Sequence, residues 1–174
     1  AIPHTYGSTS YNGKRCLSDE ASFAVKEAMV HWRREIGAAL DAEKLVILML
    51  EEPDSVFVAT GRTEWSGTGK NARRTRMVDL LDSYSCVPVE WQLSAANGSE
   101  MHVASDERFF APYWARFGKR SEYQLYLESE HLKPLLKTKS GGRVVAAWGR
   151  YGAGGLVAIP PINFGSSDFV RFDK

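Results

Sequence analysis

HWRREIGAALDAEKLVILML, residues 31–50, is the stretch that predicts the fold class of this chain. Its first part closes an apolar pattern that begins near Ser18 and recurs every three to four residues, the period of an amphipathic helix. Ser18 or Asp19 is expected to cap this helix, which should end near Lys44. The six apolar residues that follow, LVILML (45–50), predict a strand buried on both faces, as in a parallel sheet covered by helices.

The rest of the chain adds strands and two short helices to this unit. Strands are expected at VFVAT (56–60), VPVEW (87–91) and SEYQLYLES (121–129), and helices over residues 77–83 and 109–117. The tail, RVVAAWGR, YGAGG and LVAIPPINF in succession, predicts a hairpin. We therefore expect an α/β fold, a three-layer sandwich with a mixed, mainly parallel sheet and a C-terminal antiparallel hairpin.

Length and composition predict a single α/β domain over residues 1–174, because a chain of this size can bury a core without disulfides or metals. No apolar run approaches the length of a membrane span, and no pattern identifies a cofactor, so we expect neither a membrane partner nor a metal.

Two unclustered cysteines, Cys16 and Cys86, predict a reducing, cytoplasmic location. Residues 1–17 predict an irregular segment. A start without methionine is typical of a processed product or a piece of a longer protein.

The clearest functional signal is EWSGTGKNARRTR, residues 64–76. Over residues 61–76 the net charge is +4, whereas the whole chain carries +1, and this asymmetry favours a local anionic partner. The stretch is not a Walker A motif, because Glu64 stands where the first glycine is required and Asn71 follows the lysine. Glycines can still present backbone N–H groups to an anion, and lysine and arginine can supply charge. The candidate ligand-binding residues are Ser66, Gly67, Gly69, Lys70, Asn71, Arg73 and Arg74.

Two other interpretations of this stretch stay open. A flexible, solvated loop explains the same composition, although three arginines within four positions repel one another where a helix is expected to start. Trp65 could stack on a nucleic-acid base, but one tryptophan and a net charge near zero make nucleic acid the less favoured partner. We expect an anionic small molecule or a phosphate group.

Four segments carry a resemblance to a known family. They are HWRREIGAALDAEK with LVILML, then YQLYLES, PLLKTKSGGRVVAAW and YGAGGLVAIPPINF, within residues 20–50 and 120–164. In this order they resemble class I glutamine amidotransferase-like domains, which implies a flavodoxin-like sandwich. Catalytic members of that family carry a nucleophilic cysteine on a strand-to-helix turn. Cys86 stands instead in SYSCVPVE, where Pro88 removes a backbone N–H close to the place of an oxyanion hole. The resemblance thus implies a member without the amidase chemistry.

Two catalytic alternatives stay open beside a binding role. A hydrolase of the same fold could use Cys86 with His102, although no acid is placed to orient the histidine. Acidic residues also follow the strand over 45–50, where α/β sites are often built, but a charged surface turn explains them more simply: Glu51, Glu52 and Asp54. We predict a non-catalytic ligand- or partner-binding domain with a phosphate or nucleotide site at the loop over residues 61–76. A purely structural interaction domain is the third alternative.

Overall fold

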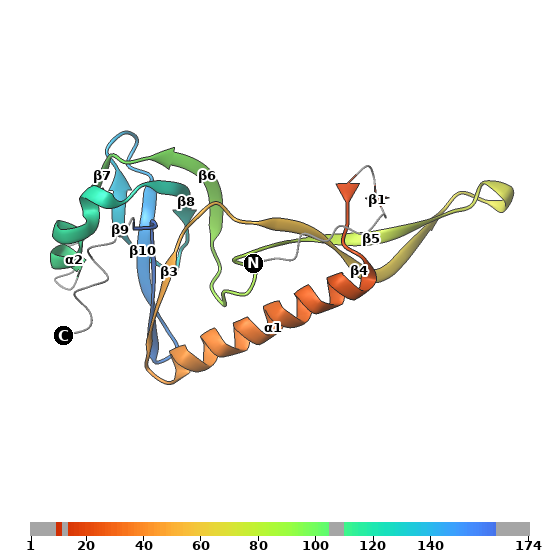
Figure 1. Ribbon diagram of the computed structural model, residues 1–174, viewed down its shortest axis with the longest axis horizontal. Helices are drawn as coiled ribbons and strands as arrows, with labels where there is room; N and C mark the ends of the chain where they lie inside the picture. The colour runs from red at the N-terminus through yellow and green to blue at the C-terminus, as the bar shows by residue number, and fades with distance from the viewer. Residues whose placement is uncertain (1–9, 12–13, 105–109, 163–174) are drawn as a thin grey trace. The chain divides into compact units, whose positions relative to one another are not determined.

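The structure, a computed structural model, describes residues 10–11, 14–104 and 110–162 (Figure 1). The chain divides into two compact units. Unit 1 comprises Ala1–Ile36 and Pro53–Pro88, and unit 2 comprises Gly37–Glu52 and Val89–Lys174. The single domain expected from length stays a prediction, because two compact units can belong to one domain. Neither α-helix of the described residues is long and apolar enough to cross a membrane.

Unit 1 is built on the greater part of a long helix, up to Ile36, and on a long β-hairpin. Helix α1 (Asp19–Asp41) confirms the predicted helix. The hydroxyl of Ser18 accepts a hydrogen bond from the N–H of Ala21 at 3.2 Å, which is how an N-cap satisfies a first-turn donor. The hairpin consists of β4 (Ser55–Ser66) and β5 (Arg73–Asp82), which pair antiparallel.

Two predictions in this part of the chain are wrong. Residues 77–83 were expected to be helical, but Val78 pairs with Ala59 and Leu81 with Val56, so residues 77–82 belong to β5. Residues 87–91 were expected to form a strand and instead lie in irregular structure. The strand predicted over 56–60 is confirmed and extends further, to Ser66. The described part of the irregular N-terminal segment contains two-residue strands, β1 (Ser10–Tyr11) and β2 (Lys14–Arg15).

The core of unit 1 lies between α1 and the base of the hairpin. Its buried residues are Leu17, Val25, Val56 and Val58. Beside this core, α1 makes two hydrogen bonds to the backbone of Ala59: the Ser22 hydroxyl accepts from its N–H at 2.9 Å, and Lys26 Nζ donates to its carbonyl oxygen at 2.7 Å. Ala59 is buried, so these bonds satisfy polar groups that water does not reach. They fix β4 to the helix at one residue.

Replacing Ser22 with alanine should remove the acceptor for the buried N–H of Ala59. An unsatisfied buried donor costs about 1–3 kcal/mol, so the free energy of unfolding should fall by that amount. Urea denaturation of Ser22→Ala measures the loss. Ser99→Ala, at an exposed position, is the control and should stay within about 0.5 kcal/mol of the parent chain. Equal stability of the two variants would contradict the proposed anchoring role.

Unit 2 contains a five-stranded mixed sheet in the order β3-β11-β10-β9-β7. Its strands are β3 (Leu45–Met49), β7 (Met101–Val103), β9 (Lys133–Thr138), β10 (Val144–Tyr151) and β11 (Gly154–Ile159). The pairing of β3 with β11 is parallel, and the other pairings are antiparallel. The C-terminal hairpin is confirmed as β10 and β11. We expected a mainly parallel sheet, but short turns join β9, β10 and β11, and short turns connect only antiparallel neighbours.

The second part of unit 2 is a two-stranded sheet and a helix. Strands β6 (Gln92–Gly98) and β8 (Tyr123–Glu128) pair antiparallel, and the alternating burial along β8 confirms the half-buried strand predicted there. Helix α2 (Phe110–Phe117) matches the helix predicted over 109–117, of which Phe109 lies outside the described residues. Its first residue joins a core with residues of β8 to β11, among them Tyr123, Leu135, Val145 and Val157. The described chain is thus mixed α/β, and the three-layer sandwich stays a prediction.

Strand β3 departs from the prediction of a strand buried on both faces. Leu45, Ile47 and Met49 are 58%, 55% and 44% exposed, whereas Val46 and Leu48 are half-buried. The strand lies at the edge of its sheet and is covered more on one face than on the other. An apolar run without alternation does not indicate which face is buried, and this is why the sequence pattern misled.

Two glycines of unit 2 should respond in opposite directions to alanine. A Cβ on Gly154 would lie 2.5 Å from the carbonyl oxygen of Leu40 and 2.6 Å from that of Lys44. A Cβ on Gly37, within α1, would have nothing within 4 Å. We expect Gly154→Ala to lower the free energy of unfolding by about 1–3 kcal/mol through overpacking, and Gly37→Ala to raise it by up to about 1 kcal/mol through helix propensity. Urea denaturation measures both. A neutral Gly154→Ala would contradict the close approach.

Candidate functional site

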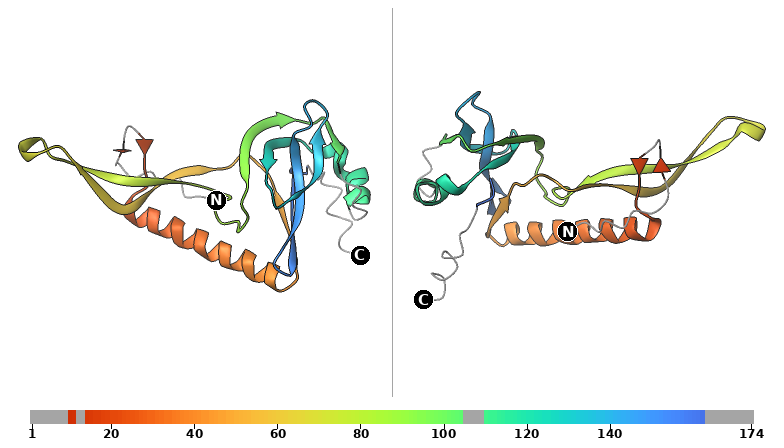
Figure 2. Two further views of the ribbon diagram at one scale, coloured as in Figure 1. Left: turned by 180° about the vertical axis from the view of Figure 1, so that it is seen from behind. Right: turned by 45° about the horizontal axis from the view of Figure 1, so that its top comes forward.

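The predicted basic loop is the outer part of the β4–β5 hairpin, and we call residues 61–76 the basic arm. Four residue pairs hold its strands together, from Thr63 opposite Arg76 to Ser66 opposite Arg73. Figure 2 shows the hairpin from two sides, and in both views its outer end continues past the N-terminal end of α1. Most side chains of the basic arm are exposed, in contrast to the buried Val56 at the base of the hairpin.

A bulge separates the basic arm from the base of the hairpin. After Ala59 the register of β4 against β5 shifts, and Gly61 has a φ of 78°, which an L side chain rarely adopts. The Thr60 hydroxyl closes the bulge: it donates to the carbonyl oxygen of Met77 and accepts from the N–H of Arg62, both at 3.1 Å. The bulge therefore lies directly beyond the point where α1 holds β4.

The backbone conformation at the tip of the basic arm requires glycine at two positions. Gly67 has a φ of 83°, and a Cβ there would lie 2.5 Å from the carbonyl oxygen of Asn71. Gly69 has a φ of 57° and opens a single 3₁₀ turn, η1 (Gly69–Asn71). The N–H groups of Asn71 and Ala72 donate to the carbonyl oxygens of Thr68 and Gly69, at 3.2 and 3.1 Å. These two amides close the tip itself, so the tip presents side chains to solvent more than a cradle of backbone N–H groups.

The basic arm carries cations that differ in their partners. Arg76 Nη2 donates to Asp19 Oδ2 at 2.6 Å and ties the root of the arm to the first turn of α1. Four other cations of the arm are exposed, and none of them forms an ion pair within the part of the chain that the structure describes: Arg62, Lys70, Arg73 and Arg74. Glu64 is the one acidic residue among them. The exposed end of the hairpin is therefore strongly cationic.

The two candidate catalytic residues belong to different units. Cys86 lies in the turn after β5, half-buried, and its Sγ donates to the carbonyl oxygen of Ser83 at 3.5 Å. Burial raises the pKa of the Cys86 thiol, Asp82 raises it further, and Arg33 opposes them. His102 is exposed on β7 of unit 2.

The acidic cluster after β3 consists of exposed residues, Glu51, Glu52 and Asp54. The N–H of Glu52 donates to the side-chain oxygen of Gln124 at 2.8 Å, which holds the start of this irregular segment against β8. Among the described residues, no group of three or more histidine, cysteine, aspartate or glutamate side chains is arranged to hold a metal ion. Exposed carboxylates in irregular structure fit a charged surface segment.

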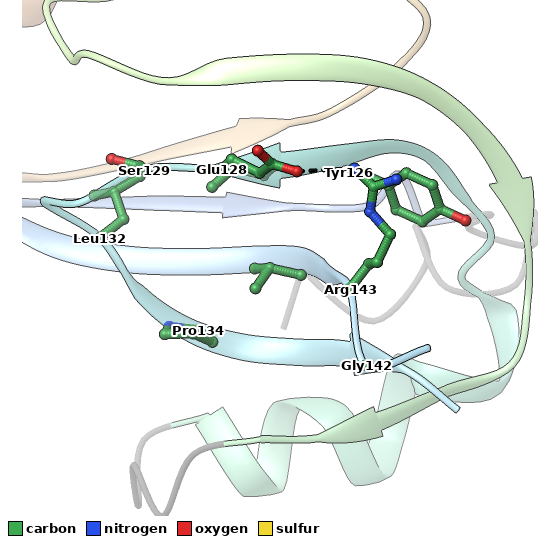
Figure 3. Close-up of a pocket in the computed structure, with 9 residues that line it drawn as sticks. Tyr126, Glu128, Ser129, Leu132, Pro134, Gly142 and Arg143 are labelled. Carbon is green, nitrogen blue, oxygen red and sulfur yellow. Dashed lines mark hydrogen bonds and ion pairs between the residues drawn. The ribbon is translucent and has the colours of Figure 1, made fainter. Parts of the chain in front are cut away.

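Unit 2 contains a cavity of about 340 Å³ that the sequence did not indicate (Figure 3). It lies between β8 and the turn that joins β9 to β10. The Arg143 guanidinium is 4.2 Å from the centre of the Tyr126 ring, and its Nη2 donates to Glu128 Oε1 at 2.8 Å. Because Glu128 neutralises this arginine, the cavity attracts an anion less than the basic arm does. Residues from β8 and from a later turn form the cavity, so no pattern within a short stretch of sequence predicts it.

Cys86 should behave as a thiol without activation. Because burial raises its pKa, its thiolate fraction at pH 7 is smaller than that of free cysteine, and the thiolate is the reactive form. We expect iodoacetamide to alkylate Cys86 more slowly than free cysteine at pH 7, with a rate that keeps rising as pH increases. The Cys86→Ser variant measures the background from Cys16, which is buried. Alkylation faster than that of free cysteine, with a plateau near neutral pH, would indicate an activated nucleophile.

The chain matches no protein-family model, no curated protein and no solved structure.

Proposed function

We propose that this chain is a non-catalytic binding module that holds an anionic group, a phosphate or a nucleotide, on the basic arm. One observation carries the proposal: four exposed cations lie within residues 62–74, and none has an ionic partner in the described structure. Like charges this close repel one another, which costs stability in the free protein. An anionic ligand relieves the repulsion and gains charge-assisted hydrogen bonds.

The chemistry of the side chains favours phosphate over a carboxylate of low charge. Arg73 and Arg74 offer planar forks that can bind two oxygens of one phosphate each, and Lys70 adds a flexible point charge at the tip. Hydrogen bonds between charged groups contribute about 1.5–3 kcal/mol each, more than neutral ones. A ligand with several phosphate oxygens could engage more than one of these cations.

A hydrolase using Cys86 gains no support from the geometry around it. The raised pKa of the thiol is opposite to what a catalytic cysteine needs at neutral pH. Glu51, Glu52 and Asp54 do not belong to any group of side chains that could hold a metal ion among the described residues. We therefore propose binding without catalysis.

The family and the location stay parts of the proposal. The helix that leads into β3 and the C-terminal hairpin agree with the resemblance to class I glutamine amidotransferase-like domains, whereas the mostly antiparallel pairing does not support a flavodoxin-like sandwich. Cys16 and Cys86 are free thiols, which supports the cytoplasmic location that we propose.

Calorimetric titration with inorganic pyrophosphate at low salt tests the proposed site. We expect binding that weakens as salt increases. Arg73→Ala and Arg74→Ala should each weaken it by about 1.5 kcal/mol, about tenfold, because each removes a charged donor. The control variant, Lys139→Ala with Arg150→Ala, removes two exposed positive charges from unit 2 and should bind pyrophosphate as the parent chain does.

Two results would count against the proposed site. One is the absence of salt-dependent pyrophosphate binding by the parent chain. The other is an equal loss of affinity in the control variant and in the arm variants, which would point to overall charge and not to the basic arm.

A further inference from the structure

We propose that the anion on the basic arm is the backbone of double-stranded DNA, and that the arm enters the major groove as a two-stranded ribbon. This inference rests on the proposed function, because it assigns a ligand class to the same cations. It goes further in that it uses the shape of the hairpin as well as its charge. Four features of the basic arm support it.

The first feature is the distribution of charge over both faces of the ribbon. In an antiparallel pair, opposite residues share a face and neighbours along a strand alternate. Trp65 lies opposite Arg74 on one face, and Ser66 lies opposite Arg73 on the other. A flat anionic surface would contact only one of these faces. A groove has phosphates along both walls, so cations on both faces can be neutralised together.

The second feature is the size of the arm. Its four residue pairs, from Thr63–Arg76 to Ser66–Arg73, reach roughly 10 Å at about 3.4 Å per step, before the tip is added. The major groove of B-form DNA is about 8.5 Å deep and about 12 Å wide, and it admits a two-stranded β-ribbon. The paired part of the arm therefore fits the depth of this groove, with Lys70 at the end that enters furthest.

The third feature is the aromatic content of the arm. Trp65 is 66% exposed, and it is the one aromatic residue between 61 and 76. Binding to single strands depends on several aromatic platforms on which successive bases stack. One tryptophan on a ribbon suits an apolar contact within a groove better, for example with a thymine methyl group.

The fourth feature distinguishes DNA from RNA. The major groove of an A-form RNA duplex is deep and too narrow for side chains to read, and its minor groove is shallow. A projecting ribbon with cations on both faces has no matching groove there. B-form DNA is thus the duplex that the basic arm fits.

Fluorescence anisotropy with a short B-form DNA duplex of mixed sequence tests the inference. The four exposed cations of the basic arm predict a plot of log affinity against log salt with a slope of about −3.6, so affinity should fall roughly a hundredfold between about 50 and about 200 mM salt. In the double variant Arg73→Ala with Arg74→Ala, the slope should fall to about −1.8. Lys139→Ala with Arg150→Ala should keep the parent slope. Methyl green, which lies in the major groove, should compete with the arm, and netropsin, which fills the minor groove, should not.

The same assay contains the outcomes that would overturn the inference. Equal or tighter binding to a single-stranded oligonucleotide, lost in Trp65→Ala, would indicate base stacking instead of groove entry. Equal binding to duplex RNA or to poly-glutamate would indicate unspecific attraction of polyanions. Arginine-dependent pyrophosphate binding without duplex binding would overturn the groove proposal and leave the proposed function intact. Failure of the chain to bind either pyrophosphate or duplex DNA would overturn both the proposed function and the groove proposal.

The lysine variant Arg73→Lys with Arg74→Lys is the control for folding. It keeps both positive charges and should show the slope of the parent chain, which excludes a folding defect as the cause of the smaller slope in the alanine variant.

Discussion

The structure of unit 1 depends on the hydrogen bonds that α1 makes to one residue of β4. The Ser22 hydroxyl and the Lys26 ammonium satisfy both backbone groups of Ala59. Up to this residue β4 has Val56 and Val58 in the core, and beyond it the bulge at Gly61 begins and the exposed arm follows. The helix therefore determines where the supported part of the hairpin ends. A different docking point would change the length of ribbon that is free to contact a ligand.

The basic arm is a ribbon without support from the core, and its own sequence contributes little to its stability. A two-stranded hairpin without a hydrophobic face is at best marginally stable in water, and clustered like charges weaken it further. The tie between Arg76 and Asp19 is exposed and contributes at most about 1 kcal/mol. A segment whose local sequence disfavours its own structure, as these clustered like charges do, is found mostly at functional sites. At a binding site the compensating interaction comes from the ligand. The weakness of the arm in the free protein therefore supports the proposed binding role.

Local periodicity predicted the elements that are amphipathic along their own length. Helix α1, strand β8 and the C-terminal hairpin belong to this class, because each shows its buried face within a short window of sequence. Strand β5 does not, since MVDLL (77–81) spaces its apolar residues as a short helix would. What makes it a strand is pairing with β4, whose register depends on residues up to 27 positions away, such as Ser55 opposite Asp82. No local window contains that information.

The same limit applies to the candidate site. The excess of positive charge over residues 61–76 is visible in the sequence. The sequence does not show that Arg76 pairs with Asp19, 57 positions away, whereas Arg73 is exposed. The direction of the charges also depends on the backbone. On a helix Arg73 and Arg74 would lie about 100° apart and could face one surface together, whereas on β5 they point to opposite faces. A ligand that surrounds the ribbon becomes the better match only once the segment is known to be a strand.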